Sequence, residues 1–182
     1  MAHDPLRLFV AIYPPLETRR AMVRTIKDLD PPPDPRHRAT PVEHVHLTAH
    51  FIGETDPRQL ADVVESVRRS AAGLNDFLLT PRRLITLPQR GRPRLIALET
   101  DTPPELLEIH RRLAHRLARP GRGRDHFLPH LTLGRFNPAA NPQPAEWPVR
   151  LDAWIVREIV LVRSVLRREG ADHATVETVP LQ

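Results

Sequence analysis

The sequence predicts an α+β fold whose sheet is largely antiparallel, and three features of the 182-residue chain indicate it. Apolar runs with the length of strands alternate with three stretches of helical periodicity. Several strand-like runs are joined by links too short for a crossover helix, which favours antiparallel pairing. The tripeptide His-Leu-Thr occurs at residues 46–48 and again at 130–132. That spacing suggests two pseudo-symmetric lobes, which we expect to form one domain over residues 1–182.

The first 41 residues read as a strand, a helix and a loop. The apolar run from Leu6 predicts a buried strand that ends before Pro14, because proline cannot donate a ladder hydrogen bond. Residues 16–29 carry apolar side chains at helical spacing. The stretch DPPPDPRHRATP, residues 30–41, is rich in proline and predicts an irregular connection.

A second strand and a second helix follow. The segment HVHLTAHFIG, residues 44–53, predicts a strand. Asp56 and Pro57 have the residue types preferred at the N-cap and at the first position of a helix. An apolar stripe at helical spacing over residues 60–71 then indicates an amphipathic helix. Three short strand-like runs come next, at residues 77–79, 83–87 and 94–98.

The remaining chain contributes one helix and several strands. Thr102 and Glu105 have the spacing of a capping box, and the helix that they open has one apolar face over residues 106–117. A strand around His130 follows, and the proline-rich residues 137–148 predict another loop. The last strand-like runs lie near residue 154, at residues 159–166 and at residues 173–179.

The composition excludes several kinds of site. The chain has no cysteine, so disulfides, thiolate zinc sites and a cysteine nucleophile are absent. The net charge is +5 and Lys27 is the only lysine, so the excess positive charge is arginine. A basic surface favours polyanions such as nucleic acid, although codon bias alone can account for the arginine. The first apolar run reads as a strand and not a signal peptide, and no run reaches membrane-spanning length, so we expect a cytoplasmic protein.

The repeated tripeptide is informative because of its surroundings. His-x-Thr alone is a weak pattern, since about 0.7 instances arise by chance at this composition. A third instance, His173-Ala174-Thr175, has no partner motif, and we interpret His173 as structural. The first two instances both have leucine in the middle, lie in apolar runs and are followed by Gly and Phe.

Because side chains alternate along a strand, each motif divides between two faces. One face is apolar and suits the core, with Leu47, Ala49 and Phe51 in the first strand and Leu131 and Leu133 in the second. The other face carries one imidazole and one hydroxyl from each strand, namely His46, Thr48, His130 and Thr132. If the two lobes face each other, these four side chains converge on one cleft.

Two imidazoles in one cleft can act as an acid and a base at the same time, because imidazole titrates near neutrality. Each proton transfer of this kind contributes about 10²- to 10⁴-fold in rate. Threonine hydroxyls can donate to the non-bridging oxygens of a phosphate. Arg135 is a candidate phosphate clamp, but strict alternation points it to the core unless Gly134 bends or ends the strand.

The order of several segments resembles a known family along nearly the whole chain. RLFVAI, HLTAHFIG, LPQRGRPRLIALET, FLPHLTLGRF and VREIVLVRSVL follow one another as in the 2H phosphoesterases. Within that superfamily the chain is most similar to RNA 2′,3′-cyclic phosphodiesterases, also described as 2′-5′ RNA ligases. The resemblance implies a bilobal α+β fold with both motifs in a central cleft. It also implies hydrolysis of a terminal 2′,3′-cyclic phosphate to a 2′-phosphate, with no metal or other cofactor.

The resemblance assigns a role to each matching residue. His46 is expected to donate a proton to the departing 3′ oxygen, and His130 to accept a proton from water. The remaining expected site residues bind substrate, with Thr48, Thr132 and Arg135 at the phosphate and Phe9 where a base or ribose lies. The expected partner is an RNA end with a 2′,3′-cyclic phosphate and not DNA or a membrane, and we expect a monomer. The chain departs from the family at His50, where many relatives have lysine, and RPRLIALET lacks an aromatic residue often found there.

Other interpretations stay open at this point. The two histidines can be structural, and His44, His46 and His50 at even spacing can form a metal site. The protein can bind RNA without turnover, or join RNA ends through a 2′-5′ bond by the reverse reaction. The roles of His44, His50 and His126 are not assigned. Some loop arginines are expected to contact an RNA backbone, among them Arg82, Arg83, Arg90, Arg92, Arg94, Arg119, Arg122 and Arg124.

Overall fold

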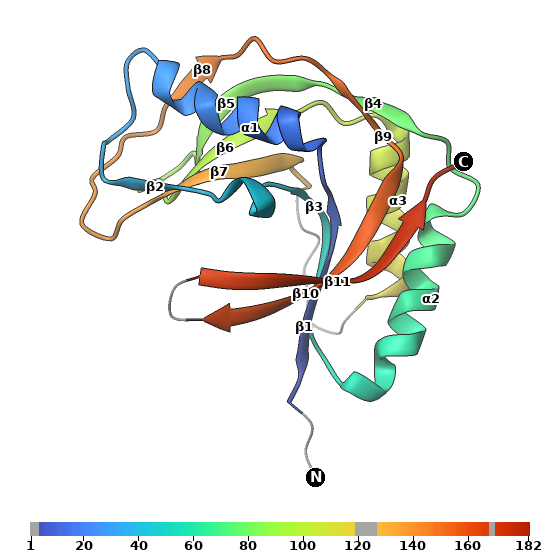
Figure 1. Cartoon of the computed structure of the whole chain (residues 1–182). Helices are drawn as coiled ribbons and strands as arrows, with labels where there is room; N and C mark the ends of the chain where they lie inside the picture. Colours follow the sequence, from blue (N-terminus) through green and yellow to red (C-terminus); the bar gives the residue numbers. More distant parts are fainter. Residues whose placement is uncertain (1–3, 119–126, 168–169) are drawn as a thin grey trace.

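An antiparallel sheet dominates the computed structural model, which describes residues 4–118, 127–167 and 170–182 (Figure 1). Within these residues nine strands form one sheet in the order β11-β10-β1-β3-β7-β6-β5-β8, and β2 also pairs with β7. The strands of the first half are β11 (Gly170–Pro180), β10 (Glu158–Arg167), β1 (Leu6–Ile12) and β3 (Leu47–Thr55). Those of the second half are β7 (His130–Phe136), β6 (Leu95–Thr100), β5 (Pro81–Leu87), β8 (Glu146–Pro148) and β2 (His37–Ala39). The α+β class with antiparallel pairing is confirmed.

The two halves of the sheet meet where the two His-Leu-Thr strands touch. Leu47 of β3 lies opposite Leu131 of β7, and both leucines are fully buried. Each half therefore presents its His-Leu-Thr strand at the junction with the other. A separate two-stranded sheet joins β4 (Phe77–Leu79) to β9 (Trp154–Val156).

Three helices bury apolar side chains against the sheet, and each forms in a segment whose apolar residues have helical spacing. They are α1 (Leu16–Thr25), α2 (Leu60–Ala71) and α3 (Pro104–Arg116). Figure 1 shows α2 and α3 side by side, and they contact β11, β10 and β3. Val63 and Val67 of α2 and Ile109 of α3 are buried in the main core, as the apolar stripes predict. None of the helices in the described part of the chain is long and apolar enough to cross a membrane.

Several boundaries differ from the predictions. The helix expected over residues 16–29 ends at Thr25 and continues as a 3₁₀ turn, Ile26–Asp28. A 3₁₀ turn, Val42–His44, takes the place of the expected start of the strand at residue 44. Asp56 does act as an N-cap, because its side chain accepts from the Arg58 amide at 2.9 Å, but it caps the 3₁₀ turn Pro57–Gln59 that precedes α2. The N-cap residue of α2 itself is Gln59.

The capping box predicted at Thr102 is wrong. Pro103 is the N-cap residue of α3, and no side-chain cap hydrogen bond forms there. Thr102 therefore lies one residue too early to cap the helix. The neighbouring Asp101 instead accepts from the Thr80 amide at 2.8 Å.

Both proline-rich stretches contain a short strand that was not expected. In the first, β2 pairs with the part of β7 from Gly134 to Phe136, beyond the contact with β3. In the second, β8 pairs with the outer edge of β5. An unpaired strand edge leaves amide and carbonyl groups without partners, so each loop segment satisfies one such edge. Trp147 anchors the second stretch to the first by donating to the Pro31 carbonyl at 2.8 Å.

Candidate active site

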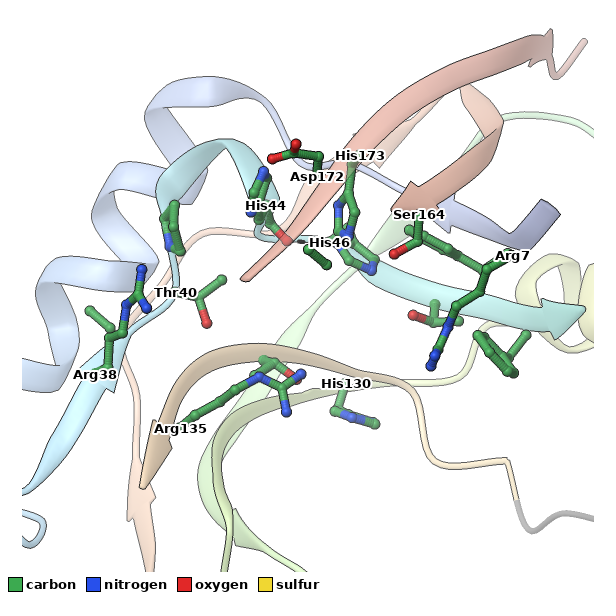
Figure 2. A pocket seen from close by; sticks show the side chains of 17 residues that line it. Arg7, Arg38, Thr40, His44, His46, His130, Arg135, Ser164, Asp172 and His173 are labelled. Carbon is green, nitrogen blue, oxygen red and sulfur yellow. Dashed lines mark hydrogen bonds between the residues drawn. The ribbon is translucent and has the colours of Figure 1, made fainter. Parts of the chain in front are cut away.

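The two His-Leu-Thr segments line one cavity of about 590 Å³ at the junction of the two halves (Figure 2). His46, just before β3, and Thr48, at its start, reach the cavity from one half, and His130 and Thr132 reach it from the start of β7. The predicted convergence of these four side chains is therefore confirmed as geometry. Phe9 of β1 and Arg135 of β7 also line the cavity, as expected.

The two motif histidines have the same hydrogen bond at Nδ1. His46 Nδ1 lies 2.7 Å from the carbonyl oxygen of His44, and His130 Nδ1 lies 2.8 Å from that of Leu128. A carbonyl oxygen can only accept, so Nδ1 carries the hydrogen in both rings. In the neutral tautomer that this selects, Nε2 is the atom that can exchange a proton.

The surroundings of His46 are aromatic. Its ring stacks on Phe9 at 4.9 Å between centroids, and Tyr13 and His173 approach it at 5.5 and 5.3 Å. Burial is the main cause that lowers the pKa of the His46 imidazole to about 4, and the charges of His173, His44 and His130 lower it further. The hydrogen bond to the His44 carbonyl opposes this shift. His46 is therefore neutral at pH 7 in the free protein.

The two threonine hydroxyls are open to the cavity. Thr48 lies opposite Ala11 of β1, and Thr132 lies opposite Ala97 of β6, so a small side chain neighbours each of them. Within the described residues, neither hydroxyl hydrogen-bonds to another protein group. Both are thus available to a bound anion.

A β-bulge brings Arg135 to the cavity. Thr132 pairs with Ala97 and Gly134 pairs with Ile96, so Leu133 is an extra residue in β7. A bulge shifts the alternation of side chains by one position. Leu133 and Gly134 are both buried, and Arg135 returns to the face of Thr132. The condition stated for Arg135 is met, although by a bulge and not by the end of the strand.

The equivalent bulge in β3 overturns two expectations. Ala49 is an extra residue between the pairs of Thr48 and His50, and Ile52 is a second extra residue. Phe51, expected in the core, therefore lies on the face of Thr48 and lines the cavity. Phe51 and Arg135 are each three residues beyond the threonine of their motif, so they occupy equivalent positions.

The bulge at Ala49 also turns the side chain of His50 away from the cavity face. Its ring lies 5.9 Å from that of His110 in α3, and His110 Nδ1 is 2.8 Å from the Ala49 carbonyl oxygen. The evenly spaced histidines considered as a metal site thus point to different faces. Within the described part of the chain, no three His, Cys, Asp or Glu side chains are placed to hold a metal ion.

His173, interpreted from the sequence as structural, lies in the cavity wall. Its ring is 4.6 Å from His44, 5.3 Å from His46 and 5.1 Å from Phe9, measured between centroids. The third His-x-Thr instance was the signal that pointed to it. Burial, together with the charge of His44, lowers the pKa of the His173 imidazole. His126 and the loop arginines Arg119, Arg122 and Arg124 lie outside the described residues.

Positive charge predominates around the cavity. Arg7, Arg38 and Arg135 line it, and among the described lining residues Asp172 is the only carboxylate. Sequence analysis did not single out Arg7 or Arg38. The alternation in RLFVAI could have identified Arg7, because it shares a strand face with Phe9.

Comparison with known proteins identifies relatives along most of the chain. Residues 14–167 match the family model of the 2′-5′ RNA ligase superfamily. A Thermus thermophilus protein named RNA 2′,3′-cyclic phosphodiesterase is 30% identical over 190 positions, which cover 97% of this chain and 91% of that protein. A Thermotoga maritima protein of the same name is 28% identical over 94 positions, 51% of this chain and 50% of that one. The crystal structure of apo LigT from E. coli has a TM-score of 0.79 at 25% identity and covers 99% of each chain.

Proposed function

This chain belongs to the 2′-5′ RNA ligase superfamily, and from that premise we propose that it hydrolyses 2′,3′-cyclic phosphate ends of RNA to 2′-phosphomonoesters. The observation that carries the proposal is the shared geometry of His46 and His130. Both line one cavity, and in both rings Nδ1–H donates a hydrogen bond to a backbone carbonyl oxygen. Two such imidazoles supply both proton transfers that the reaction needs, so no metal is required for them. The names of the relatives support the reaction class.

In the proposed reaction, water attacks the phosphorus atom of the cyclic phosphate. His130 Nε2 accepts the proton of the water as the new P–O bond forms. The bond from phosphorus to O3′ breaks, and the protonated Nε2 of His46 donates its hydrogen to O3′. One water is consumed, and the products are a 2′-phosphate and a 3′-hydroxyl. The hydroxyls of Thr48 and Thr132 and the guanidinium of Arg135 stabilise the negative charge on the non-bridging oxygens.

The low pKa of His46 bears on its role as donor. In the free protein the imidazole is neutral above about pH 4, so the donor form must be created in the complex. A bound cyclic phosphate is an anion, and an anion beside an imidazole favours the protonated form. The assignment of His46 as donor and His130 as acceptor comes from the family resemblance, because the hydrogen bonds at Nδ1 are the same in both rings.

A direct assay tests the proposed function. The protein would be incubated in excess EDTA with a short RNA that ends in a 2′,3′-cyclic phosphate, beside His46→Ala and His130→Ala. We expect turnover to the 2′-phosphate by the wild type, lowered in each variant by about 10²- to 10⁴-fold. Formation of the 3′-phosphate would contradict the proposed bond cleavage. Loss of turnover in EDTA would point to a metal, and RNA binding without turnover to a binding module.

Joining of RNA ends by the reverse reaction would use the same two imidazoles. Adding an RNA with a free 5′-hydroxyl to the assay distinguishes the two directions by the length of the product. A cytoplasmic location, a preference for RNA over DNA and a monomeric state stay predictions.

A further inference from the structure

A polar row crosses three strands at one end of the cavity. Along β1, Arg7, Phe9 and Ala11 face the cavity side, while Leu8 and Val10 face the main core. Arg7 lies opposite Ser164 of β10, and Ser164 lies opposite His173 of β11. The adjacent row is apolar, because Phe9 lies opposite Val162. Arg7, Ser164 and His173 all line the cavity.

The guanidinium of Arg7 contacts an aromatic ring and is not paired with a carboxylate in the described part of the chain. It lies 5.1 Å from the centroid of the Phe51 ring, in a cation–π contact. Arg7 forms no ion pair within the described residues. Arg83 is a contrast, because it pairs with Glu99 and Glu146 at 2.7 Å each. The Ser164 side chain beside Arg7 is largely buried and has no hydrogen-bond partner in the described part of the chain.

Arg7 and Arg135 reach the site from opposite sides. In Figure 2, Arg135 extends towards the cavity on one side of His130 and Arg7 extends towards it on the other. Arg7 is two residues from Phe9, which stacks on His46, so its Cα lies about 7 Å further along the strand. A second anion can therefore occupy the Arg7 end while the reacting phosphate lies between the histidines.

A nucleotide at the end of an RNA chain carries two phosphate groups, the cyclic phosphate on its 2′,3′ edge and a phosphodiester on its 5′ oxygen. We propose that Arg7 and Ser164 form a second phosphate subsite that binds the 5′ phosphate of the terminal nucleotide. The protein then selects RNA chain ends and 5′-phosphorylated nucleotides over cyclic mononucleotides with a free 5′-hydroxyl. This inference rests on the proposed function, since that function places the cyclic phosphate between His46 and His130.

The chemistry of the two side chains suits this ligand. A guanidinium can donate two parallel hydrogen bonds to a phosphate, and a hydroxyl adds a third donor. The aromatic contact with Phe51 limits the rotamers of Arg7, so less freedom is lost on binding. His173 completes the wall of the subsite. Its Nδ1 is buried and has no hydrogen-bond partner within the described residues, and we assign it no contact with the phosphate.

The test compares three substrates that share one reacting group. They are adenosine 2′,3′-cyclic phosphate, its 5′-phosphorylated form, and the dinucleotide ApA with a 2′,3′-cyclic phosphate end. We expect Arg7→Gln to lower kcat/KM roughly ten- to hundredfold on the two substrates with a 5′ phosphate. On the substrate with a free 5′-hydroxyl, kcat/KM is expected to stay within about twofold. An equal loss on all three would assign Arg7 to the reacting phosphate, and no loss on any would remove it from the site.

Two control variants distinguish binding of the 5′ phosphate by Arg7 from a general effect of positive charge. Arg163→Gln removes one positive charge from the adjacent strand at an exposed position that does not line the cavity, and is expected to leave the substrate preference unchanged. Arg135→Gln is expected to lower kcat/KM similarly on all three substrates, because its proposed partner is the reacting phosphate. Thermal unfolding of Arg7→Gln beside the wild type checks that the fold is intact.

A binding measurement decides the inference even if the protein turns over none of these substrates. Calorimetry would compare adenosine 2′-phosphate with adenosine 2′,5′-bisphosphate. The wild type is expected to bind the bisphosphate more tightly, roughly tenfold or more, and Arg7→Gln to lose most of that difference. Equal affinities for the two ligands in the wild type would overturn the subsite. Absence of turnover together with a retained affinity difference would instead overturn the proposed function alone.

Discussion

His46 and His130 donate Nδ1–H to the carbonyl oxygen two residues before each of them, His44 and Leu128, at 2.7 and 2.8 Å. The match shows that the two halves of the sheet present their imidazoles in the same local geometry. The environments nevertheless differ, because Phe9, Tyr13 and His173 surround the His46 ring. The hydrogen bonds orient both rings, and the difference in surroundings is what can divide the roles of acid and base.

A substrate with sulfur at the bridging 3′ position tests which imidazole is the acid. A thiolate leaves without being protonated, because a thiol is a far stronger acid than an alcohol. We expect His46→Ala to lose about 10²- to 10⁴-fold in rate on the oxygen substrate and to come within about tenfold of the wild type on the sulfur substrate. His130→Ala is expected to stay slow on both. The opposite pattern would exchange the two roles.

The titration of His46 is measurable in the free protein by NMR. Because burial lowers the pKa of its imidazole to about 4, we expect its ring resonances to shift with a midpoint near pH 4, below the ordinary histidine range. Saturation with adenosine 2′-phosphate should raise the midpoint, because the phosphate charge favours the imidazolium. A midpoint near 6.5 in the free protein would show that the ring is solvated. No rise on binding would place the phosphate away from His46.

His173 is expected to help hold the pKa of His46 down. Its ring lies against the His46 ring, and burial is the first cause of the low value. We expect His173→Ala to admit water and to raise the NMR midpoint of His46 towards 6.5. His173→Phe retains an aromatic wall, so the midpoint should remain well below 6.5. If His173→Ala leaves the midpoint unchanged, the burial of His46 comes from Phe9 and Tyr13 alone.

Much of the fold was predictable because periodicity is a local property. The apolar stripe of α2 and the alternation around His130 appear directly in the sequence. The strands β2 and β8 were not predictable in this way. Each is three residues long in a proline-rich segment, and each exists because another strand has an edge to be paired. Which strand edge needs a partner depends on the tertiary arrangement, so the local sequence pattern does not predict these two strands.

In the candidate site too, the local sequence predicted the position of some residues and not of others. Alternation correctly placed His46 and Thr48 on one face, since no bulge lies between them. It failed for His50, Phe51 and Arg135, which all follow a bulge at the residue after threonine. A bulge depends on hydrogen bonding to the neighbouring strand, so it is not visible in one strand alone. The resemblance to a family did place Arg135 at the cavity.

The two motif threonines are expected to contribute to catalysis and not to folding. Thr48→Val and Thr132→Val keep the shape of the side chain and remove a hydroxyl that has no protein partner in the described residues. We expect each to lower kcat by about 10²-fold or more, with the free energy of unfolding changed by less than about 1 kcal/mol. Thr86→Val is the matched control, because the buried Thr86 hydroxyl accepts from the Ala145 amide at 2.9 Å and Thr86 does not line the cavity. It should destabilise the fold by about 1–3 kcal/mol and leave kcat unchanged. Denaturant unfolding and initial rates measured side by side check both expectations, and a motif variant that loses stability without losing rate would make its hydroxyl structural.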